Sequence, residues 1–274
     1  MAELPEVETI RRQLSAEIAG AAWENVRARP CSVFRSPAAL VARSLTGARV
    51  CSADRKGKVL ILNFDNGWSL LVHLGMSGQV LLRPPAEPGP AHRHLEAELS
   101  DGRTLVFRDP RRFGFIKVVR TGEMEKQKEV AGVGADPLSP VFTWEKFVSA
   151  LKENRASAKA FLLNQQLFCG LGNIYADEVL FTARVAPGRR TGDLSVVEMK
   201  DLFHAVRTVL SSAIECGGTS FDAAFVDVFG RPGLYGGRLK VYGREKEKCV
   251  TCHTALRLLK VSGRSSVFCP HCQK

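Results

Sequence analysis

Two pairs of cysteines near the end of the chain constrain its fold more than any other feature. Cys249 and Cys252 form one C-x-x-C pair, and Cys269 and Cys272 form a second pair after sixteen intervening residues. Two such turns can present four thiolates to one tetrahedral zinc ion, so the spacing predicts a zinc ribbon. Two disulfides or unrelated core cysteines are the alternative, but the other four cysteines are scattered singly. Because so short a segment has little core of its own, we expect bound zinc to supply much of its folding free energy.

The segment around these cysteines is basic. Arg257, Lys260 and Arg264 lie between the two pairs, and Phe268 precedes the second pair. From Arg231 to the end there are ten Lys or Arg residues and two Asp or Glu residues. A zinc-braced hairpin with this charge indicates a finger that contacts phosphate groups. A purely structural zinc lobe with a solvated basic surface is the alternative.

The composition points to a globular protein that binds a polyanion. The chain has 274 residues, which is enough for two domains, and a formal net charge of +11. Nucleic acid is therefore the first candidate partner. No long apolar stretch and no basic leader are found, so we expect no membrane partner. Free thiols with a zinc site fit a reducing cytoplasm.

The first residues combine a free amine with a helix. Ala2 has a small side chain, and initiator Met is usually removed before such a residue, which would leave a free primary amine at Ala2 followed by Glu3. Pro5 suits the first turn of a helix. Apolar residues then recur at helical spacing: Val7, Ile10, Leu14 and Ile18. Glu6 and Glu8 are explained by the helix dipole, whereas Glu3 lies before the predicted helix and is explained less well.

Residues 26–119 have the pattern of an antiparallel β domain. The predicted strands are 50–54, 59–64, 69–74, 95–99 and 104–108. Two turn signals, Asp65-Asn66-Gly67 and Asp101-Gly102, separate consecutive strands. Short strands at this spacing predict a β-sandwich or barrel.

Three features of this β region do not serve a core. Lys58 follows Arg-Lys-Gly at the start of a strand, residues 73–78 (HLGMSG) form a glycine-bounded loop, and residues 109–114 (DPRRFG) form a tight turn with two arginines. Lys58 could simply be solvated, Met76 could fill the core and Phe113 could anchor its loop. The sequence leaves these alternatives open.

The second half of the chain is helical. A polar, glycine-rich linker is predicted over 131–140. The predicted helices are 144–154, 158–165, 173–183 and one that starts at a Ser195–Glu198 capping box and ends near Ile214. Two of them are joined by a glycine turn ahead of Asn173, which could form a phosphate clamp or a plain helix cap. Residues 219–237 form a long loop of the kind that is usually mobile or functional.

Five motifs occur in order along the whole chain: AELPEVET, LGMSG, DPRRFG, GLGNIYADE and the final cysteine pairs. In these motifs the chain resembles the bacterial formamidopyrimidine-DNA glycosylase family, whose endonuclease VIII branch shares the layout. The resemblance implies an α+β fold around a DNA cleft. It places an N-terminal helix plus β-sandwich at 1–130, a linker at 131–140, a helix-two-turns-helix domain with a lesion loop at 141–237 and a zinc finger at 238–274.

The resemblance also implies an activity. The family removes oxidised purines, chiefly 8-oxoguanine and formamidopyrimidines, from duplex DNA and then nicks the strand by β,δ-elimination. By position, the amine of Ala2 would attack C1′ of the flipped nucleotide and form a Schiff base. Glu3 would act as general acid/base, and Lys58 would supply a proton or a phosphate contact. Arg264 would hold a phosphate and assist the second elimination.

An α-amine is a suitable nucleophile because its reference pKa of about 8 lies well below the value of about 10.4 for Lys. Flipping the base leaves a hole in the stack, and the resemblance implies that Met76, Arg111 and Phe113 fill it, with Arg111 contacting the orphaned cytosine. The further DNA contacts that it implies are His92, Arg155, Lys159, Asn173 and Tyr175. The loop at 219–237 would close over the damaged base.

One departure from the family pattern bears on catalysis, because the family has Pro where this chain has Ala2. A proline amine gives an iminium that is always cationic, whereas an alanine amine gives an imine that must be protonated. An impaired protein that binds lesions is therefore one alternative.

Two further alternatives stay open: an endonuclease VIII-like glycosylase for oxidised pyrimidines, and a general zinc-dependent nucleic-acid binder. The main expectation is a monomeric enzyme of the bacterial cytoplasm, associated with the nucleoid, with one structural zinc ion and damaged duplex DNA as its partner.

Overall fold

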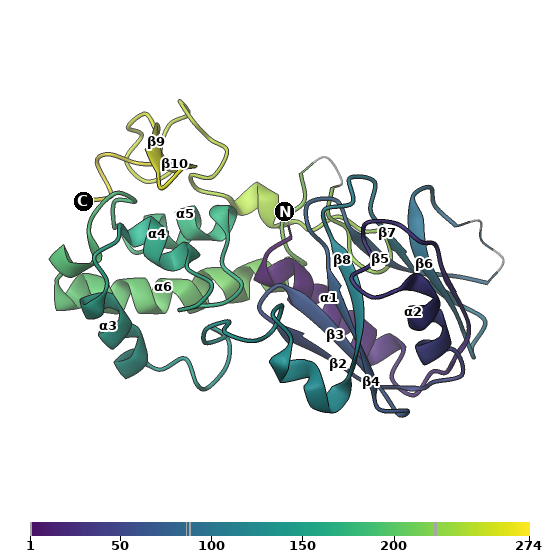
Figure 1. Cartoon of the computed structure of the whole chain (residues 1–274). Helices are drawn as coiled ribbons and strands as arrows, with labels where there is room; N and C mark the ends of the chain where they lie inside the picture. Colours follow the sequence, from purple (N-terminus) through teal and green to yellow (C-terminus); the bar gives the residue numbers. More distant parts are fainter. Residues whose placement is uncertain (1, 86, 88, 222–223) are drawn as a thin grey trace. The chain divides into compact units, whose positions relative to one another are not determined.

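The computed structural model describes residues 2–85, 87, 89–221 and 224–274. Its contacts divide the chain into two compact units (Figure 1). The first unit comprises residues 1–131 and 216–236, and the second comprises residues 132–215 and 237–274. Each unit is described by itself.

The first unit contains two four-stranded antiparallel sheets, which confirms the predicted β-sandwich. One sheet has the order β1 (Trp23–Ala28), β6 (Arg93–Leu99), β7 (Thr104–Arg108) and β5 (Gln79–Arg83). The other has the order β2 (Val50–Lys56), β3 (Val59–Phe64), β4 (Trp68–His73) and β8 (Phe115–Arg120). Gly67 and Gly102 both have positive φ at the predicted hairpin turns.

Helix α1 (Leu4–Glu17) shares its core with both sheets. Val7, Ile10 and Leu14 are buried in one cluster with Leu62 of β3 and Phe107 of β7. Burial of such side chains stabilises the fold by about 1.5–3 kcal/mol each. The helix is therefore fixed against the sandwich, and the residues just before it are fixed as well.

Glu3 has a structural role that the sequence pattern understated. It is the N-cap of α1, and its carboxylate forms a reciprocal capping box with Glu6. The Glu3 backbone N–H donates to Glu6 Oε2 at 2.8 Å. Both carboxyl side chains are buried, so capping holds Glu3 in place directly after residue 2.

Glu8 ties α1 to the second sheet through three arginines. Its carboxylate accepts from Arg11 Nη2 at 2.9 Å, Arg12 Nε at 2.8 Å and Arg55 Nε of β2 at 3.1 Å. Burial by itself would raise the pKa of Glu8, but the hydrogen bonds from these arginines hold that pKa at about 2. The cluster fixes α1 relative to the β2–β3 hairpin that carries Lys58.

Several elements were not predicted from the sequence. Helix α2 (Ala38–Leu45) begins after Pro37 with no side-chain cap, so it lacks the usual start signal. Strands β1, β5 and β8 were also missed, and none of them alternates strictly between buried and exposed positions. A 3₁₀ helix at Thr121–Lys126 follows β8.

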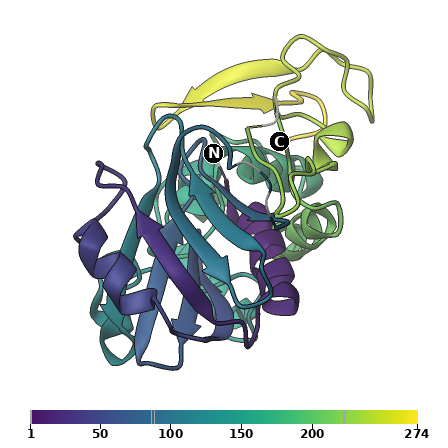
Figure 2. The same ribbon diagram turned by 90° about the vertical axis from the view of Figure 1, so that its right-hand side faces the viewer.

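The second unit consists of helices and a zinc-ribbon hairpin. Its elements are α3 (Trp144–Glu153), α4 (Ala158–Leu163), α5 (Asn173–Thr182), a 3₁₀ turn (Thr191–Asp193), α6 (Val196–Glu215), β9 (Arg257–Val261) and β10 (Arg264–Phe268). A further 3₁₀ turn spans Tyr235–Arg238. The predicted capping box is confirmed, since the Ser195 backbone N–H donates to Glu198 Oε2 at 2.8 Å. The hairpin is the pair of yellow strands in Figure 2.

An aromatic cluster forms the core of the helices. The ring centroid of Phe142 lies 5.6 Å from that of Phe147, 5.4 Å from that of Phe168 and 5.0 Å from that of Phe203. Phe161 packs against Phe147 and Phe168 in turn. Aromatic pairs at these distances stabilise by about 0.5–1.5 kcal/mol beyond the area they bury.

Two segments differ from their predicted roles. The predicted linker is packed: Gly134 N donates to the Gln165 carbonyl at 2.8 Å and Ala135 N to the Leu167 carbonyl at 3.1 Å. The 216–236 segment, predicted as part of the helical domain, makes its contacts with the first unit. Glu6 Oε1 accepts from the Thr219 backbone N–H at 2.7 Å.

No helix within the described ranges is long and apolar enough to cross a membrane.

We expect Glu8→Gln to destabilise the first unit by about 1–3 kcal/mol at neutral pH, because the arginines lose their charged partner. The folded-state pKa of Glu8 is depressed, so its contribution is present above the unfolded value of 4.5 and is lost as the pH falls through about 2. Urea unfolding at several pH values measures the difference between wild type and variant, which should shrink as the pH falls from 4.5. Glu98→Gln, at the exposed Arg27 pair, is the matched control and should change stability by under about 0.5 kcal/mol. Equal losses for both variants would contradict this account.

Candidate functional site

Residue 2 is held against the loop at 74–78. The Ala2 backbone nitrogen donates to the Gly75 carbonyl at 3.2 Å, and Ala2 is only 8% exposed. Gly75 has φ +60°, and a Cβ there would lie 2.5 Å from the backbone carbon of Phe113. Only glycine fits this position, which brings the chain start, the HLGMSG segment and the DPRRFG segment together.

One buried carboxylate joins the two loops at 74–78 and 109–114, which we call the paired loops. Asp109 Oδ1 accepts from Ser77 Oγ at 2.5 Å, and Oδ2 accepts from the Gly114 backbone N–H at 2.8 Å. The Arg111 backbone N–H donates to Ser77 Oγ at 3.2 Å. Asp109 itself is fully buried, so hydrogen bonds to a buried carboxylate fix the position of one loop relative to the other.

The tips of the paired loops expose large side chains. Met76 is 41% exposed and Phe113 is 57% exposed, although both are apolar. The Arg111 guanidinium lies over the Phe113 ring at 4.8 Å from its centroid. Two of the simpler explanations therefore fail, because Met76 does not fill the core and Phe113 does not anchor its loop.

His73 lies on the strand that pairs with the residue after Lys58, and it also binds Gly75, the residue that contacts Ala2. No role was predicted for His73 from the sequence. His73 pairs with Val59, the residue after Lys58, and its Nδ1 accepts from the Gly75 backbone N–H at 3.1 Å. Burial, together with the positive charges of Lys58 and Arg35, lowers the pKa of His73 to about 4. His73 is therefore neutral near pH 7. A histidine at the end of an apolar strand, just before a glycine loop, was the available signal.

Two further predicted contacts lie on exposed turns. His92 is exposed with φ 59° just before β6, and Arg264 is exposed at the first position of β10. The turn before Arg264 has positive φ at both Ser262 and Gly263, which is the geometry of a tight hairpin. Arg155 is also exposed, after α3.

Lys159 does not have the role expected for it. Its side chain is fully buried, and Nζ donates to Asp177 Oδ1 at 2.7 Å and to the Ser265 carbonyl at 2.7 Å. An ammonium group held in this way does not reach a phosphate in solvent, so the predicted direct DNA contact is wrong. Tyr175 is likewise completely buried in α5, so its predicted contact is wrong for the same reason.

Two buried acids of α5 hold the zinc lobe, and their roles were missed. Asp177 accepts from Ser266 Oγ and from the Val267 backbone N–H, both on β10. Glu178 accepts from three consecutive backbone N–H groups at residues 240–242 at 2.9–3.1 Å. Burial raises the pKa of both carboxyl groups, while Lys159 and these hydrogen bonds act in the opposite direction.

Asn173 opens α5 but does not cap it. The N-cap is Gly172, and no side-chain cap is present. Asn173 Oδ1 is buried and lacks a hydrogen-bond partner among the described residues. The plain capping alternative therefore fails, and the amino end of a ten-residue helix remains next to this side chain.

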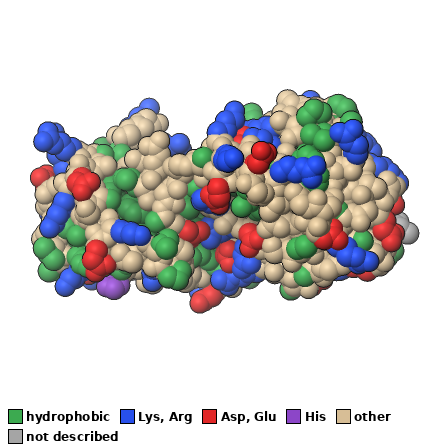
Figure 3. Space-filling model, turned by 60° about the horizontal axis from the view of Figure 1, so that its bottom comes forward, with side chains coloured by type: hydrophobic (Ala, Val, Ile, Leu, Met, Phe, Trp, Pro, Cys, Tyr) green, Lys and Arg blue, Asp and Glu red, His purple; other side chains and the backbone are tan. Residues whose placement is uncertain are grey.

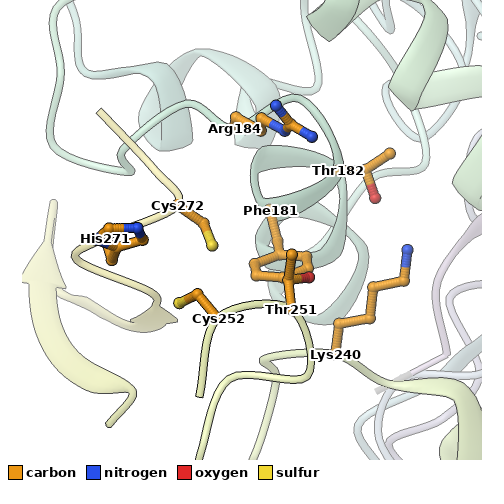
Figure 4. A pocket seen from close by; sticks show the side chains of 8 residues that line it. All are labelled: Phe181, Thr182, Arg184, Lys240, Thr251, Cys252, His271 and Cys272. Atoms are coloured by element: carbon orange, nitrogen blue, oxygen red, sulfur yellow. The ribbon is translucent and has the colours of Figure 1, made fainter. Parts of the chain in front are cut away.

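The four predicted zinc ligands are brought together. Their sulfur atoms all lie within 4.8 Å of one another. The Cys249 and Cys269 sulfurs each accept a backbone N–H at 3.4 Å, as metal-binding thiolates do. Figure 4 shows the sulfurs of Cys252 and Cys272 directed into the same space beside His271. This donor set fits one structural zinc ion, and it leaves no open position for catalysis.

Charge is dispersed on the face shown in Figure 3, where Lys and Arg side chains alternate with Asp and Glu side chains. Among the described residues, that face has no continuous basic stripe of the kind that follows a nucleic-acid backbone.

We expect Lys159→Met to destabilise the second unit by about 3–5 kcal/mol, because it leaves the buried Asp177 carboxylate without its cation. Equilibrium urea unfolding followed by circular dichroism measures the loss. Glu247→Gln, whose exposed carboxylate pairs with Arg244 in the same lobe, is the control and should cost under about 1 kcal/mol. A Lys159→Met variant as stable as the control would show that the buried pair does not hold the lobe.

The comparisons with known proteins cover each part of the chain. Residues 1–116 match the formamidopyrimidine-DNA glycosylase N-terminal domain, and residues 133–224 match the H2TH domain of that enzyme. Residues 246–274 match the zinc finger found in FPG and IleRS.

Whole proteins give the same assignment. The chain is 43% identical to the formamidopyrimidine-DNA glycosylase of a Nocardioides species over 283 residues, which span all of this chain and 94% of the relative. It is 43% identical to that of Salinispora arenicola over 277 residues, spanning all of this chain and 96% of the relative. Among solved structures, Lactococcus lactis Fpg with abasic-site DNA matches with a TM-score of 0.91 and 32% identity over 100% of both chains. The MutM (Fpg) protein of Thermus thermophilus matches with a TM-score of 0.87 and 39% identity over 99% of this chain and 98% of that one. The chain therefore belongs to the formamidopyrimidine-DNA glycosylase family of DNA repair enzymes.

Proposed function

We propose that this enzyme excises oxidised purines from duplex DNA through a Schiff base at the amine of residue 2 and then nicks the strand by β,δ-elimination. The observation that carries the proposal is the contact of the Ala2 nitrogen with the Gly75 carbonyl, in the loop that exposes Met76. Solved structures of Lactococcus lactis Fpg are complexes with DNA that contains an abasic site, an oxidised pyrimidine or Fapy-dG. Purine lesions are proposed for this chain on that basis and on the resemblance of its motifs.

Removal of Met1 would leave a free amine at Ala2, next to the Gly75 carbonyl. Because the reference pKa of an α-amine is about 8, a far larger fraction of it is unprotonated near neutral pH than of a Lys amine, and the carbonyl of Gly75 can orient it. Glu3 follows directly and is only 2% exposed. Its carboxylate is held by the capping box, which supports the role of a positioned acid/base for opening the sugar ring.

Lys58, close to the neutral His73, supports a role in the elimination step that differs from the roles of Ala2 and Glu3. His73 is neutral, so the only fixed positive charge of this pair is on Lys58. We propose that Lys58 attracts the phosphate next to the lesion or gives a proton during elimination. The Arg55–Glu8 ion pair holds the hairpin on which Lys58 lies.

The paired loops suit insertion into a base stack. Met76 and Phe113 are exposed apolar groups on loops whose positions are fixed by Asp109. The stacked Arg111 guanidinium can form hydrogen bonds with an unpaired base. Unstacking the damaged base costs a few kcal/mol. Contacts of the paired loops with the DNA offset this cost, and these loops need little reorganisation to make them.

Phosphate contacts are proposed for the exposed His92, Arg155 and Arg264 and for Asn173 at the amino end of α5. We further propose that the enzyme acts as a monomer in the bacterial cytoplasm, at the nucleoid.

A second function is supported by one residue. An imine formed by Ala2 must be protonated before it withdraws electrons, whereas a proline iminium is already cationic. A protein that binds lesions with slow turnover is therefore the alternative.

Borohydride trapping on duplex containing 8-oxoguanine tests the proposal. We expect a covalent adduct at Ala2 by peptide mass spectrometry, and Ala2→Pro should raise the rate of trapping by roughly tenfold. Glu3→Gln should retain binding but lose base removal. Lesion binding with neither adduct nor nicking in the wild type, and trapping restored by Ala2→Pro, would favour the second function. Equal affinity for damaged and intact duplex would contradict both.

Zinc content tests the role of the cysteine cluster. We expect one zinc ion per chain by elemental analysis. Cys269→Ser should lower the zinc content, and it should weaken DNA binding because the hairpin that carries Arg264 is no longer stabilised by the metal. Cys216→Ser, outside the cluster, should keep the full zinc content. Full zinc in Cys269→Ser would contradict the assignment.

A further inference from the structure

A thiol, an imidazole and a backbone carbonyl form a linked set beside the paired loops. Cys31 Sγ lies 3.4 Å from His94 Nδ1, and His94 Nε2 lies 3.0 Å from the Asp109 carbonyl oxygen. Cys31 is half-buried and His94 is only 6% exposed. In the sequence Cys31 is one of four cysteines outside the zinc ligands, and the proposed excision reaction does not use it.

The direction of these hydrogen bonds follows from the carbonyl. A carbonyl oxygen can only accept, so His94 Nε2 carries a hydrogen and donates to Asp109. In the neutral imidazole the other ring nitrogen is then an acceptor, so the Cys31 S–H donates to Nδ1. A nucleophile, a base and a group that orients the base are thus in place.

The thiol opens into a cavity of about 310 Å³ with a basic lining. Its walls include Arg29, Arg93, His92 and Arg112. Two of these arginines, Arg29 and Arg93, are paired with Glu96 at 3.2 Å and 2.8 Å. Arg112 is exposed, and no ion pair involves it among the residues that the structure describes. The cavity therefore has room for a small molecule and favours an anionic one.

We propose that Cys31 is a covalent modification site that undergoes thiol–disulfide exchange with small anionic disulfides, with His94 as its base. Another thiol of the same unit, Cys51, offers a comparison, because it is more exposed and its sulfur donates to the Arg49 carbonyl at 3.9 Å, with no histidine as hydrogen-bond partner among the described residues.

The reaction balances without another reactant. His94 Nδ1 takes the proton of the Cys31 thiol, and the thiolate sulfur attacks one sulfur of the disulfide. A new S–S bond forms at Cys31 as the original S–S bond breaks. The departing thiolate then takes the proton from His94, which gives a mixed disulfide and one free small thiol.

The modification has a consequence that rests on the proposed function. An adduct would occupy a cavity bordered by His92, a proposed phosphate contact, and by Arg112 of the DPRRFG turn. Its negative charge would repel a DNA backbone. We expect the adduct to weaken lesion binding by about tenfold and expect reduction by dithiothreitol to restore it.

The test uses the full zinc-loaded chain and oxidised glutathione as the probe, with mass spectrometry of the peptides that contain residues 31 and 51. We expect Cys31 to form the mixed disulfide about tenfold faster than Cys51. His94→Gln should slow the reaction at Cys31 to the rate of Cys51 without changing Cys51. Because His94 also binds the paired loops, Arg112→Gln provides an independent variant. It should slow oxidised glutathione severalfold but leave the neutral bis(2-hydroxyethyl) disulfide unaffected.

Equal or faster modification of Cys51 would overturn the proposal, as would a Cys31 rate that is insensitive to both substitutions. These outcomes are read without DNA, so they are independent of the excision activity. If Cys31 is modified as expected but lesion binding is unchanged, in a chain that excises normally, the site stands and its coupling to DNA is refuted. Cys31→Ser should excise at the wild-type rate and keep that rate in oxidised glutathione.

Discussion

Buried carboxylates that accept backbone N–H groups hold several functional segments of this enzyme in place. An ionised acid is costly to bury unless its oxygens are hydrogen-bonded, and each of these acids meets that requirement by clamping a loop or a strand. Glu6 binds the start of α1 and the Thr219 backbone, Asp109 joins the paired loops, and Glu178 binds residues 240–242. Removing one carboxylate would leave several buried donors unsatisfied at once, so these positions tolerate little change.

Hydrogen bonds to buried carboxylates also explain why exposed apolar and cationic groups can be held in position for a ligand. The exposed side chains of Met76 and Phe113 are not stabilised by burial in the core, and their positions depend on Asp109 and on the close approach at Gly75. Arg264 depends in a similar way on β10, whose backbone is held by Asp177 and Lys159. Rigid presentation of this kind lowers the reorganisation that accompanies binding.

Neighbouring positive charges favour the ionised form of buried acids in both units and disfavour the charged form of His73. In the first unit three arginines keep the pKa of Glu8 low, and the positive charges near His73 help to keep that imidazole neutral. In the second unit a single lysine offsets the burial of Asp177. Surface exposure separates these from pairs such as Arg27–Glu98, which lie in water and contribute little.

The sequence by itself determined the zinc ligands, the sandwich, the main helices and the family, because cysteine spacing, strand alternation and turn residues act over short distances along the chain. The resemblance of its motifs also pointed to Met76, Arg111 and Phe113, although the local pattern left a core role for Met76 and an anchoring role for Phe113 open. Only the tertiary structure decided that Lys159 and Tyr175 are buried, that Glu3 caps α1 and that the 216–236 segment belongs to the first unit. The burial of Lys159 and the placement of the 216–236 segment depend on partners far away in the sequence, such as Ser265 for Lys159 and Glu6 for Thr219. No local pattern encodes which distant group will satisfy a buried charge.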